Sequence, residues 1–320
     1  MKIAVLDDYL GYSSRFCDWG DLADNVTVFS DPIPVGDRAE TLAPFDVLCV
    51  MRERTPLPAS LIAALPNLRM IVTTGPRNLA IDIAAAKARG ITVCGTGNRT
   101  TSTSHLAITL ILAAMRNLVP NVNAMQRGGW QVRAGRDLDG LTLGLIGLGR
   151  LGAAVADLAR PFGMRLIAWS ENLTTERCDE VGGVKRMESL NALLSESDVA
   201  SIHVVLSDRT RGLIGAEGFE KMKPDAVIVN TSRGPIVDEQ AMMAALRAGR
   251  LGCAALDVYD QEPLPADSPL RDVDLFDSGR LLLTPHIGYG ALATYALMYR
   301  ETAEDVCQWA QNSPIRVISS

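Results

Sequence analysis

The sequence predicts an α/β protein built on parallel sheets. Short runs rich in valine and isoleucine recur along its 320 residues, and alanine- and leucine-rich amphipathic segments separate them. Strands that are apolar on both faces and alternate with helices are typical of a parallel sheet covered on both sides. The expected strands are more numerous than a single sheet usually contains, and a chain of this length corresponds to about two average domains. We therefore expect a break between two sheets.

The expected strands fall into two sets along the chain. The first set is expected near residues 2–6, 26–29, 46–51, 69–73 and 91–94. The second set is expected near residues 141–146, 165–169, 199–205, 226–230, 253–257 and 281–284. Amphipathic helices are expected between them at residues 58–65, 79–89, 150–161, 187–195 and 238–248. This alternation is the pattern of βαβ units.

The break between the two sets is expected near residues 95–140. A helix from about Ser102 to Asn117 follows the first set, and a polar, glycine-rich stretch at 126–140 precedes the second. After the last strand, a helix at 291–311 and a short apolar run need a place to pack. We expect this tail to return to the first domain. The predicted domains are therefore 1–98 with 290–320, and 99–289.

Composition and charge exclude several classes of function. The net charge is −6 and no basic block occurs, which predicts no nucleic-acid partner. The longest apolar stretch, Leu106 to Met115, is shorter than the ~20 residues of a membrane span. Asp7 and Asp8 interrupt the apolar N-terminal run too early for a signal peptide. Six scattered cysteines without a C-x-x-C pair predict neither a metal site nor a disulfide framework, and we expect a cytoplasmic protein.

A glycine-rich loop follows the first strand of the second set. It reads Gly147-Leu148-Gly149-Arg150-Leu151-Gly152, between an apolar run and an alanine-rich helix. In a strand–loop–helix context the first glycine allows a tight turn, the second admits a pyrophosphate, and the third lets helix pack on strand. The helix N-terminus adds free N–H groups for the phosphates. The loop therefore predicts a dinucleotide-binding site.

The end of the next strand bears on the choice between NAD and NADP. An acidic residue is expected there to bind the ribose hydroxyls, and the sequence has Ser170 followed by Glu171. Loss of the acid would accommodate a 2′-phosphate, but the next basic residue is Arg177. Glu171 would instead bind the 2′-hydroxyl and repel a phosphate. We favour NAD and keep NADP as the alternative.

Three later strands end in residues that suit acid–base chemistry. In an open α/β sheet, ligands bind at the carboxyl ends of the strands. Arg233, Glu262 and His286 each follow such an end. Together they favour hydride transfer assisted by a proton donor. His286 is one of only three histidines, because His105 lies in the expected linking helix and His203 within an apolar strand.

The chain resembles the D-isomer-specific 2-hydroxyacid dehydrogenase family over nearly its whole length. The motifs that carry the resemblance are the glycine loop, Gly-Gly-Trp130-Gln, Asn230-Thr231-Ser-Arg233-Gly, Asp257-Val-Tyr-Asp-Gln-Glu262-Pro and Thr284-Pro-His286-Ile-Gly288. The resemblance implies a Rossmann coenzyme-binding domain and a discontinuous flavodoxin-like substrate domain. It also implies an active site in the cleft between them and usually a homodimer.

The resemblance also implies a role for each matching residue. The residue matching Arg233 binds the carboxylate and carbonyl of a keto acid. The one matching His286 gives a proton to the carbonyl oxygen, and the one matching Glu262 hydrogen-bonds that histidine and raises its pKa. Asp257 matches the residue that contacts the nicotinamide carboxamide. Thr231 and Gly288 lie in the same motifs, and we include them with the coenzyme-binding residues.

The first domain departs from the family pattern where substrate is expected to bind. A loop there usually holds the substrate carboxylate with consecutive backbone N–H groups, and here it reads Thr74-Gly75-Pro76-Arg77-Asn78. Because proline has no N–H, two outcomes are expected. Either carboxylate binding involves Gly75 and shifts toward the Arg77 side chain, or the substrate is an unusual one. Arg54, and Arg52 beside it, follow another strand of this domain and are further candidates to face the substrate.

The sequence therefore predicts an oxidoreductase that interconverts a small 2-keto acid and a D-2-hydroxy acid. A glyoxylate or hydroxypyruvate reductase is the kind of activity expected. The alternative is an NAD(H)-sensing, corepressor-like scaffold with little turnover, because such proteins share the fold and the same three side chains. No extra tail or basic region in the sequence supports that alternative.

Overall fold

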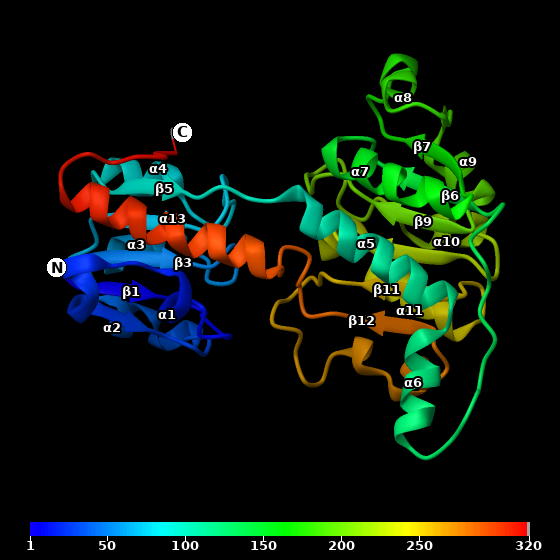
Figure 1. The fold of residues 1–320 in the computed structure, drawn as a ribbon, viewed down its shortest axis with the longest axis horizontal. Helices are drawn as coiled ribbons and strands as arrows, with labels where there is room; N and C mark the ends of the chain where they lie inside the picture. The colour runs from blue at the N-terminus through cyan, green and yellow to red at the C-terminus, as the bar shows by residue number, and fades with distance from the viewer. Residues whose placement is uncertain (319–320) are drawn as a thin grey trace. The chain divides into compact units, whose positions relative to one another are not determined.

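The computed structural model describes residues 1–318 and divides the chain into two units. Unit 1 comprises Met1–Arg99 and the segment that begins at Gly290, and unit 2 comprises Thr100–Tyr289. The last two residues of the predicted first domain, 319 and 320, lie outside the described residues. Figure 1 shows unit 1 in blue to cyan with its C-terminal segment in red, and unit 2 in the intervening colours.

Unit 1 contains a five-stranded parallel sheet in the order β2-β1-β3-β4-β5. Its strands are β1 (Ile3–Val5), β2 (Val26–Val28), β3 (Val47–Val50), β4 (Met70–Thr73) and β5 (Thr92–Gly95). Every residue of β1, β3 and β4 is buried, as expected for strands covered on both faces. The order 2-1-3-4-5 is that of flavodoxin-like folds, so the predicted fold class of this part is confirmed.

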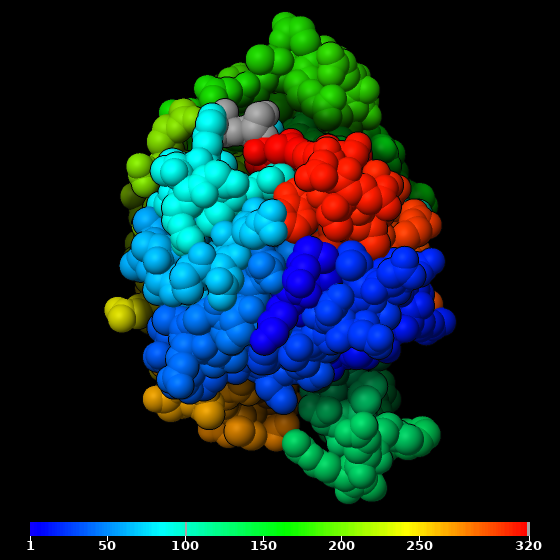
Figure 2. All heavy atoms as spheres, turned by 90° about the vertical axis from the view of Figure 1, so that its left-hand side faces the viewer, coloured from blue at the N-terminus to red at the C-terminus, as the bar shows by residue number. Residues whose placement is uncertain are grey.

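Short helices and one long helix cover the sheet of unit 1. They are α1 (Ser13–Phe16), α2 (Arg38–Leu42), α3 (Ala59–Ala64), α4 (Ile83–Ala88) and α13 (Leu292–Ala310), with short 3₁₀ turns at Gly20–Asn25 and Val35–Asp37. The prediction of a helix from residue 79 was wrong, because the Asp82 side chain accepts a hydrogen bond from the Ala85 N–H and caps α4 there. Figure 2 shows the C-terminal segment, in red, next to cyan residues on its left and above blue residues of the N-terminal part.

Unit 2 contains a seven-stranded parallel sheet in the order β12-β11-β10-β9-β6-β7-β8. Its strands are β6 (Thr142–Ile146), β7 (Arg165–Trp169), β8 (Val184–Arg186), β9 (Val199–Ile202), β10 (Val227–Asn230), β11 (Cys253–Leu256) and β12 (Leu281–Leu283). Read from β8, this is the Rossmann order 3-2-1-4-5-6 with one added strand, as predicted. The strand order reverses between β6 and β9, so ligands are expected at the carboxyl ends of these two strands.

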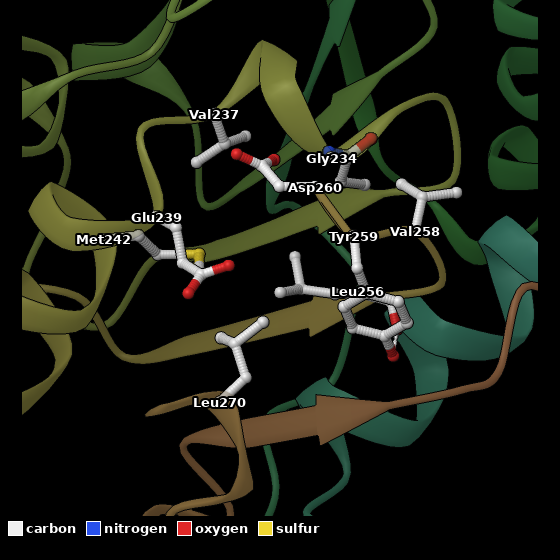
Figure 3. A pocket seen from close by; sticks show the side chains of 10 residues that line it. Gly234, Val237, Glu239, Met242, Leu256, Val258, Tyr259, Asp260 and Leu270 are labelled. Atoms are coloured by element: carbon white, nitrogen blue, oxygen red, sulfur yellow. Dashed lines mark hydrogen bonds between the residues drawn. The ribbon is translucent and has the colours of Figure 1, made fainter. Parts of the chain in front are cut away.

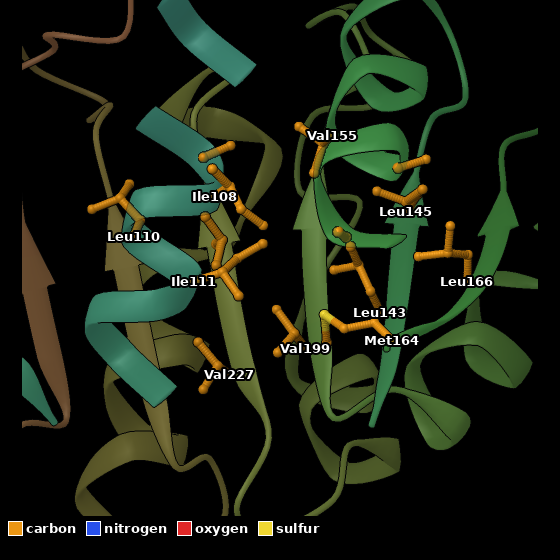
Figure 4. Close-up of a cluster of buried hydrophobic side chains, with 14 of the residues drawn as sticks. Ile108, Leu110, Ile111, Leu143, Leu145, Val155, Met164, Leu166, Val199 and Val227 are labelled. Atoms are coloured by element: carbon orange, nitrogen blue, oxygen red, sulfur yellow. The ribbon is translucent and has the colours of Figure 1, made fainter. Parts of the chain in front are cut away.

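Helices cover both faces of the second sheet. They are α5 (Thr100–Met115), α6 (Leu118–Gln126), α7 (Arg150–Ala159), α8 (Thr175–Val181), α9 (Leu190–Glu196), α10 (Ala216–Lys221), α11 (Glu239–Arg247) and α12 (Val273–Asp277), with 3₁₀ turns at Arg160–Phe162, Gly234–Ile236 and Pro269–Arg271. Figure 4 shows Ile108 and Ile111 of α5 packing with Val227 of β10 and Val199 of β9. Each such side chain contributes about 1.5–3 kcal/mol when fully buried. This packing explains why α5 belongs to unit 2.

Two elements of unit 2 differ from the sequence-based expectation. β8 was not predicted, because only Val184 of its three residues is buried while Lys185 and Arg186 are exposed, as suits an edge strand. The expected single helix at 102–117 is followed by a second helix, α6. Asn117 has a left-handed backbone (φ +47°), so the helix cannot continue through it and the chain changes direction between α5 and α6.

None of the helices described in residues 1–318 is by itself long and apolar enough to cross a membrane. Helices α5 and α6 meet that criterion only as a pair, by length and composition, and they are bent by 68° relative to each other.

Candidate active site

The glycine loop of unit 2 has the geometry of a phosphate-binding turn. Gly147 has φ +100°, a conformation that other residues rarely adopt, and a Cβ there would meet the backbone of His203. A Cβ on Gly152 would lie 2.1 Å from the Gly147 carbonyl oxygen, so α7 packs directly on the turn. A Cβ on Gly149 would meet nothing within 4 Å, which leaves its face of the loop open to a ligand. Arg150 and Leu151 follow in the first turn of α7.

A cavity of about 580 Å³ lies beside this loop. Its walls come from the glycine loop, from the segment after β7 and from the segment after β9, which is where the strand order reverses. The lining residues include Gly147, Gly149, Ser170, Glu171, Arg177, His203 and Arg209. The volume is within the range of small-molecule sites. The loop and cavity thus form a pocket of the kind predicted for a dinucleotide.

An ion pair joins two exposed residues that line this cavity. The Glu171 carboxylate lies 3.0 Å from the Arg209 guanidinium, and both side chains are more than 60% exposed. Arg177 lines the same cavity, donates to the Leu148 carbonyl oxygen at 3.0 Å and pairs with Glu180. The Arg209 contact was not predictable from sequence patterns, because this arginine lies 38 residues from Glu171 in an irregular loop.

His203 lies in the wall of the cavity as a neutral side chain. Its Nε2 is 2.9 Å from the Ser201 hydroxyl, and burial lowers its pKa from 6.5 to about 4. A neutral imidazole suits a structural position against the Gly147 turn. His203 is therefore a poor proton donor near neutral pH. The remaining histidine outside the His286 loop, His105, lies on α5 and is exposed.

His286 and Glu262 form a hydrogen-bonded pair at the carboxyl edge of the same sheet. The His286 Nδ1 lies 2.5 Å from a Glu262 carboxylate oxygen, and the second oxygen of Glu262 accepts from the Tyr259 N–H at 2.9 Å. The two side chains are 23% and 31% exposed, so the pair is reachable from solvent. His286 also has a left-handed backbone (φ +51°), which is costly for a non-glycine residue and typical of functional sites.

Asp257 holds the loop that carries His286. It is buried at the end of β11, and its two oxygens accept from the Thr284 hydroxyl at 2.5 Å, the Ile287 N–H at 2.9 Å and the Gly288 N–H at 2.7 Å. Burial raises the pKa of Asp257, while these donors and the His286 charge oppose that shift. Sequence reasoning missed this loop-holding contact, although an aspartate at a strand end hinted at it.

Arg233 follows β10 in a turn fixed by Asn230. The Asn230 amide donates to the Arg233 carbonyl oxygen at 2.9 Å and accepts from the Ser232 N–H at 3.0 Å, and Arg233 Nη1 donates to the Ser232 carbonyl oxygen at 2.7 Å. Figure 3 shows Gly234 beside Tyr259, where a Cβ would lie 2.2 Å from the Tyr259 carbonyl carbon. This close packing fixes the Arg233 turn against the segment that leads to Glu262.

Thr231 is buried, and its hydroxyl has no hydrogen-bond partner among residues 1–318. Buried hydroxyls are almost always paired, so an orphan near the carboxyl edge indicates a missing polar group. The orphaned hydroxyl, the open Gly149 face and the cavity beside the glycine loop together fit a dinucleotide. Unit 2 therefore brings together all of its predicted site residues along one sheet edge.

The predicted substrate residues of unit 1 gather at the carboxyl edge of its own sheet. Gly75 has φ +89°, and its N–H donates to the Thr96 hydroxyl at 2.8 Å. Arg77 is exposed. Arg54 Nη1 donates to the Asp7 carbonyl oxygen at 2.8 Å, and its guanidinium lies over the Tyr9 ring at 4.2 Å.

Comparison with known proteins gives a consistent family. The model of the D-isomer specific 2-hydroxyacid dehydrogenase NAD binding domain matches residues 108–288. A D-3-phosphoglycerate dehydrogenase from Archaeoglobus fulgidus is 37% identical over 83% of this chain, but the chain spans only half of that protein's length. A glyoxylate reductase from Korarchaeum cryptofilum is also 37% identical, over 78% of this chain and 76% of its own.

A solved structure agrees with these sequence matches. A phosphoglycerate oxidoreductase from Vibrio cholerae is 34% identical to this chain, and the two structures align with a TM-score of 0.89. The alignment covers 98% of this chain and 99% of the Vibrio chain. The family model covers more than half of the chain and includes the glycine loop, the Arg233 turn and the His286 loop. The chain belongs to the D-isomer-specific 2-hydroxyacid dehydrogenase family and carries that family's NAD-binding domain.

Proposed function

We propose that this protein transfers a hydride between a nicotinamide coenzyme and a small 2-keto acid, giving a D-2-hydroxy acid. The observation that carries the proposal is the His286–Glu262 pair, 2.5 Å apart at the sheet edge that also bears the glycine loop. Reducing a ketone builds alkoxide charge, so a proton donor that titrates near neutrality is needed at the reacting oxygen. Glyoxylate and hydroxypyruvate are the substrates we favour, since the Korarchaeum relative is named a glyoxylate reductase and a relative from Thermotoga maritima is named a hydroxypyruvate reductase.

Each side chain of unit 2 has a distinct part in this reaction. The reduced coenzyme, when bound, supplies the hydride that forms the new C–H bond. Arg233 presents a planar fork that binds the substrate carboxylate and polarises its carbonyl. As the carbonyl π electrons move to oxygen, the His286 Nε2–H bond breaks and its proton passes to that oxygen. Glu262 accepts from the His286 Nδ1–H and stabilises the imidazolium before this transfer.

The residues of unit 2 also suit the coenzyme. The free N–H groups at the start of α7 would bind the coenzyme phosphates, and the open face of Gly149 would leave room for them. The Thr231 hydroxyl, which has no hydrogen-bond partner among the described residues, would be available to hydrogen-bond the coenzyme. Gly288 and Asp257 hold the edge of the sheet where the nicotinamide is expected. Unit 1 then serves as the substrate domain.

A substrate panel tests the proposed reaction. Loss of NADH or NADPH absorbance is followed with glyoxylate, hydroxypyruvate, pyruvate, phenylpyruvate and longer keto acids. We expect turnover on at least one short keto acid, and a product of D configuration wherever reduction creates a stereocentre, as it does with hydroxypyruvate and pyruvate but not with glyoxylate. Absence of turnover on every member, together with a protein partner that NADH releases, would instead support the NAD(H)-sensing alternative.

We propose NAD as the preferred coenzyme. Glu171 lines the cavity after β7, where its carboxylate is available to the ribose hydroxyls and repels a 2′-phosphate. Arg209 partly offsets that repulsion, because its guanidinium lies 3.0 Å from the same carboxylate. The preference is therefore expected to be modest.

Glu171→Gln is expected to shift the ratio of NADPH to NADH affinity by about tenfold toward NADPH, or ~1.4 kcal/mol. The substitution removes the repelling carboxylate and leaves Arg209 available to a phosphate. Fluorescence titration of the two reduced coenzymes measures both dissociation constants. Glu196→Gln is the matched control, because it breaks the exposed Lys185–Glu196 pair of unit 2. An unchanged ratio in Glu171→Gln would contradict the proposed role.

We also propose that the protein is a homodimer that associates through α6 and the loop after it. Five large apolar side chains in this segment are exposed, namely Leu118, Val122, Met125, Trp130 and Val132. Trp130 is 75% exposed, and Figure 1 shows α6 and its loop at the margin of unit 2. Apolar patches of this kind usually mark a protein–protein interface.

Trp130→Glu is expected to convert the dimer to a monomer, because a buried carboxylate would be introduced into an apolar interface. Light scattering after gel filtration measures the mass, which should fall from that of two chains to that of one. Val35→Glu is the control, since Val35 is another exposed valine, at 78%, and is not part of this segment. A wild-type protein of single-chain mass would refute the proposed dimer.

A cytoplasmic location stays a prediction from the sequence.

A further inference from the structure

Tyr259 lies where three loops of the candidate active site meet. Its backbone N–H donates to a Glu262 carboxylate oxygen at 2.9 Å. Its backbone packs so closely on Gly234, in the turn after β10, that a Cβ on the glycine would lie 2.2 Å from the Tyr259 carbonyl carbon (Figure 3). Its hydroxyl donates to the Thr284 carbonyl oxygen at 2.8 Å, two residues before His286. One residue therefore contacts each of the segments that carry the arginine, the glutamate and the histidine of the site.

Core packing alone does not require the Tyr259 hydroxyl. The side chain is only 8% exposed and belongs to the same cluster of buried apolar side chains as Ile236, Leu256 and Leu270. A phenylalanine would fill nearly the same volume without bringing a polar group into the core. A buried hydroxyl costs free energy unless it is hydrogen-bonded. The contact that this hydroxyl makes is therefore the feature to explain.

The hydroxyl bridges the ends of two neighbouring strands as a donor. Burial raises the pKa of Tyr259, and the nearby Asp257 and Glu262 carboxylates raise it further, so the hydroxyl keeps its proton at neutral pH. Besides its bond to the Thr284 carbonyl oxygen at 2.8 Å, it approaches the Leu256 carbonyl oxygen at 3.3 Å. Leu256 ends β11 and Thr284 follows β12, and these two strands pair in parallel. The hydroxyl thus fixes one strand end against the other.

The Thr284 carbonyl oxygen connects this hydroxyl to the backbone of His286. The same oxygen accepts from the His286 N–H at 3.0 Å, which closes the turn in which His286 has φ +51°. A left-handed non-glycine residue persists only where its surroundings fix it. Asp257 holds the Thr284 hydroxyl and the two N–H groups that follow His286, whereas Tyr259 holds the carbonyl group that precedes the histidine.

We propose that the Tyr259 hydroxyl is a positioning group that aligns His286 with Glu262. The proposal rests on the proposed keto acid reductase function, in which this pair supplies the proton. The backbone N–H of Tyr259 fixes the glutamate and its hydroxyl fixes the turn of the histidine, so one buried side chain sets the separation of the two partners. Tyr259 is a positioning residue, because its hydroxyl acts on the histidine through the Thr284 carbonyl group.

Tyr259→Phe removes the hydroxyl and keeps the ring in the core. One neutral hydrogen bond corresponds to about a 2- to 12-fold change, so single-turnover hydride transfer at saturating NADH should slow by that factor. The dissociation constant of NADH should not change. The falling limb of the pH profile of kcat/KM for reduction should move to lower pH, because a misaligned Glu262 carboxylate favours the imidazolium less.

A double-mutant cycle separates a positioning role from a purely structural one. Glu262→Gln keeps an acceptor for the Tyr259 N–H but removes the charge that the hydroxyl is proposed to align. In that background Tyr259→Phe should slow hydride transfer less than it does in the wild type, because both groups act through one contact. Independent, multiplicative losses would overturn the proposal. So would a wild-type rate or an unmoved limb in Tyr259→Phe.

Tyr299→Phe is the matched control for loss of a buried hydroxyl. Tyr299 lies on α13 in unit 1, is 2% exposed, and donates its hydroxyl to the Asp8 carboxylate at 2.8 Å. The substitution is the same and the lost hydrogen bond has the same length. It should lower the melting temperature and leave the limb of the pH profile in place. An equal shift of the limb in both variants would overturn the proposal, because it would indicate general loosening of the fold.

The outcome remains readable if the proposed reaction itself fails. The chain has three histidines, so ¹³C-labelled histidine gives three ring signals in NMR spectra, and His286→Gln identifies the signal of His286. In a wild type that reduces no keto acid, the midpoint of its titration is still measured. A lower midpoint in Tyr259→Phe, with no change in Tyr299→Phe, would support the positioning role. An equal or higher midpoint in Tyr259→Phe would overturn it.

Discussion

Replacing His286 with glutamine is expected to lower turnover of the keto acid by at least ~10²-fold, the usual scale of general acid help. Glutamine keeps a polar side chain but carries no proton that it can give to an alkoxide. Its amide can still meet Glu262, so the loop held by Asp257 should keep its place. The dissociation constant of NADH should stay within about twofold of wild type. Stopped-flow hydride transfer and fluorescence titration separate the two quantities.

The pH profile gives this prediction its control. The wild-type kcat/KM for reduction should fall as pH rises, because the donor must be an imidazolium. Burial lowers the pKa of His203 to about 4, so His203 does not produce that limb. His105→Gln, on the exposed face of α5, should retain the limb. Asp305→Asn should also retain the falling limb of the pH profile. This variant is a control because burial raises the pKa of Asp305 to about 7, so Asp305 also titrates near neutral pH. Wild-type turnover, or an unchanged limb, in His286→Gln would refute the role.

Much of the fold followed from the pattern of apolar runs. Central strands of a parallel sheet are buried on both faces, so β1, β4 and β10 stand out in the sequence as unbroken apolar segments. An edge strand such as β8 has no such requirement, since solvent covers one side of it. The break at Asn117 depends on one backbone angle that asparagine tolerates but does not dictate.

The site was predictable to the extent that it lies at strand ends. The carboxyl-edge rule selected Arg233, Glu262 and His286 because each follows a strand of the same sheet. Contacts between distant loops carried no sequence signal. The Glu171–Arg209 pair and the approach of Arg52 to Gly75 depend on how loops 20 or more residues apart fold back. Such contacts arise from tertiary packing, which local patterns do not encode.

Gly152→Ala is expected to weaken binding of reduced coenzyme by at least ~10²-fold and to destabilise the protein by about 1–3 kcal/mol. The added methyl group would lie 2.1 Å from the Gly147 carbonyl oxygen, a backbone atom that cannot rotate away. Either α7 or the turn must shift. Because the N–H groups that face the phosphates lie at the start of α7, a shift of the helix moves them out of register. Urea unfolding and NADH titration measure the two effects.

Gly149→Ala separates the two roles of the loop. A Cβ at position 149 meets nothing within 4 Å, so the coenzyme-free protein should unfold at the same urea concentration as wild type. The methyl group would instead occupy the space next to the α7 N-terminus, and NADH binding should weaken. A loss of stability in Gly149→Ala equal to that in Gly152→Ala would mean that the open face is filled by protein. Unchanged NADH binding would mean that the pyrophosphate lies elsewhere. The contrast between two glycines three residues apart thus distinguishes a packing requirement from a ligand requirement within a single turn.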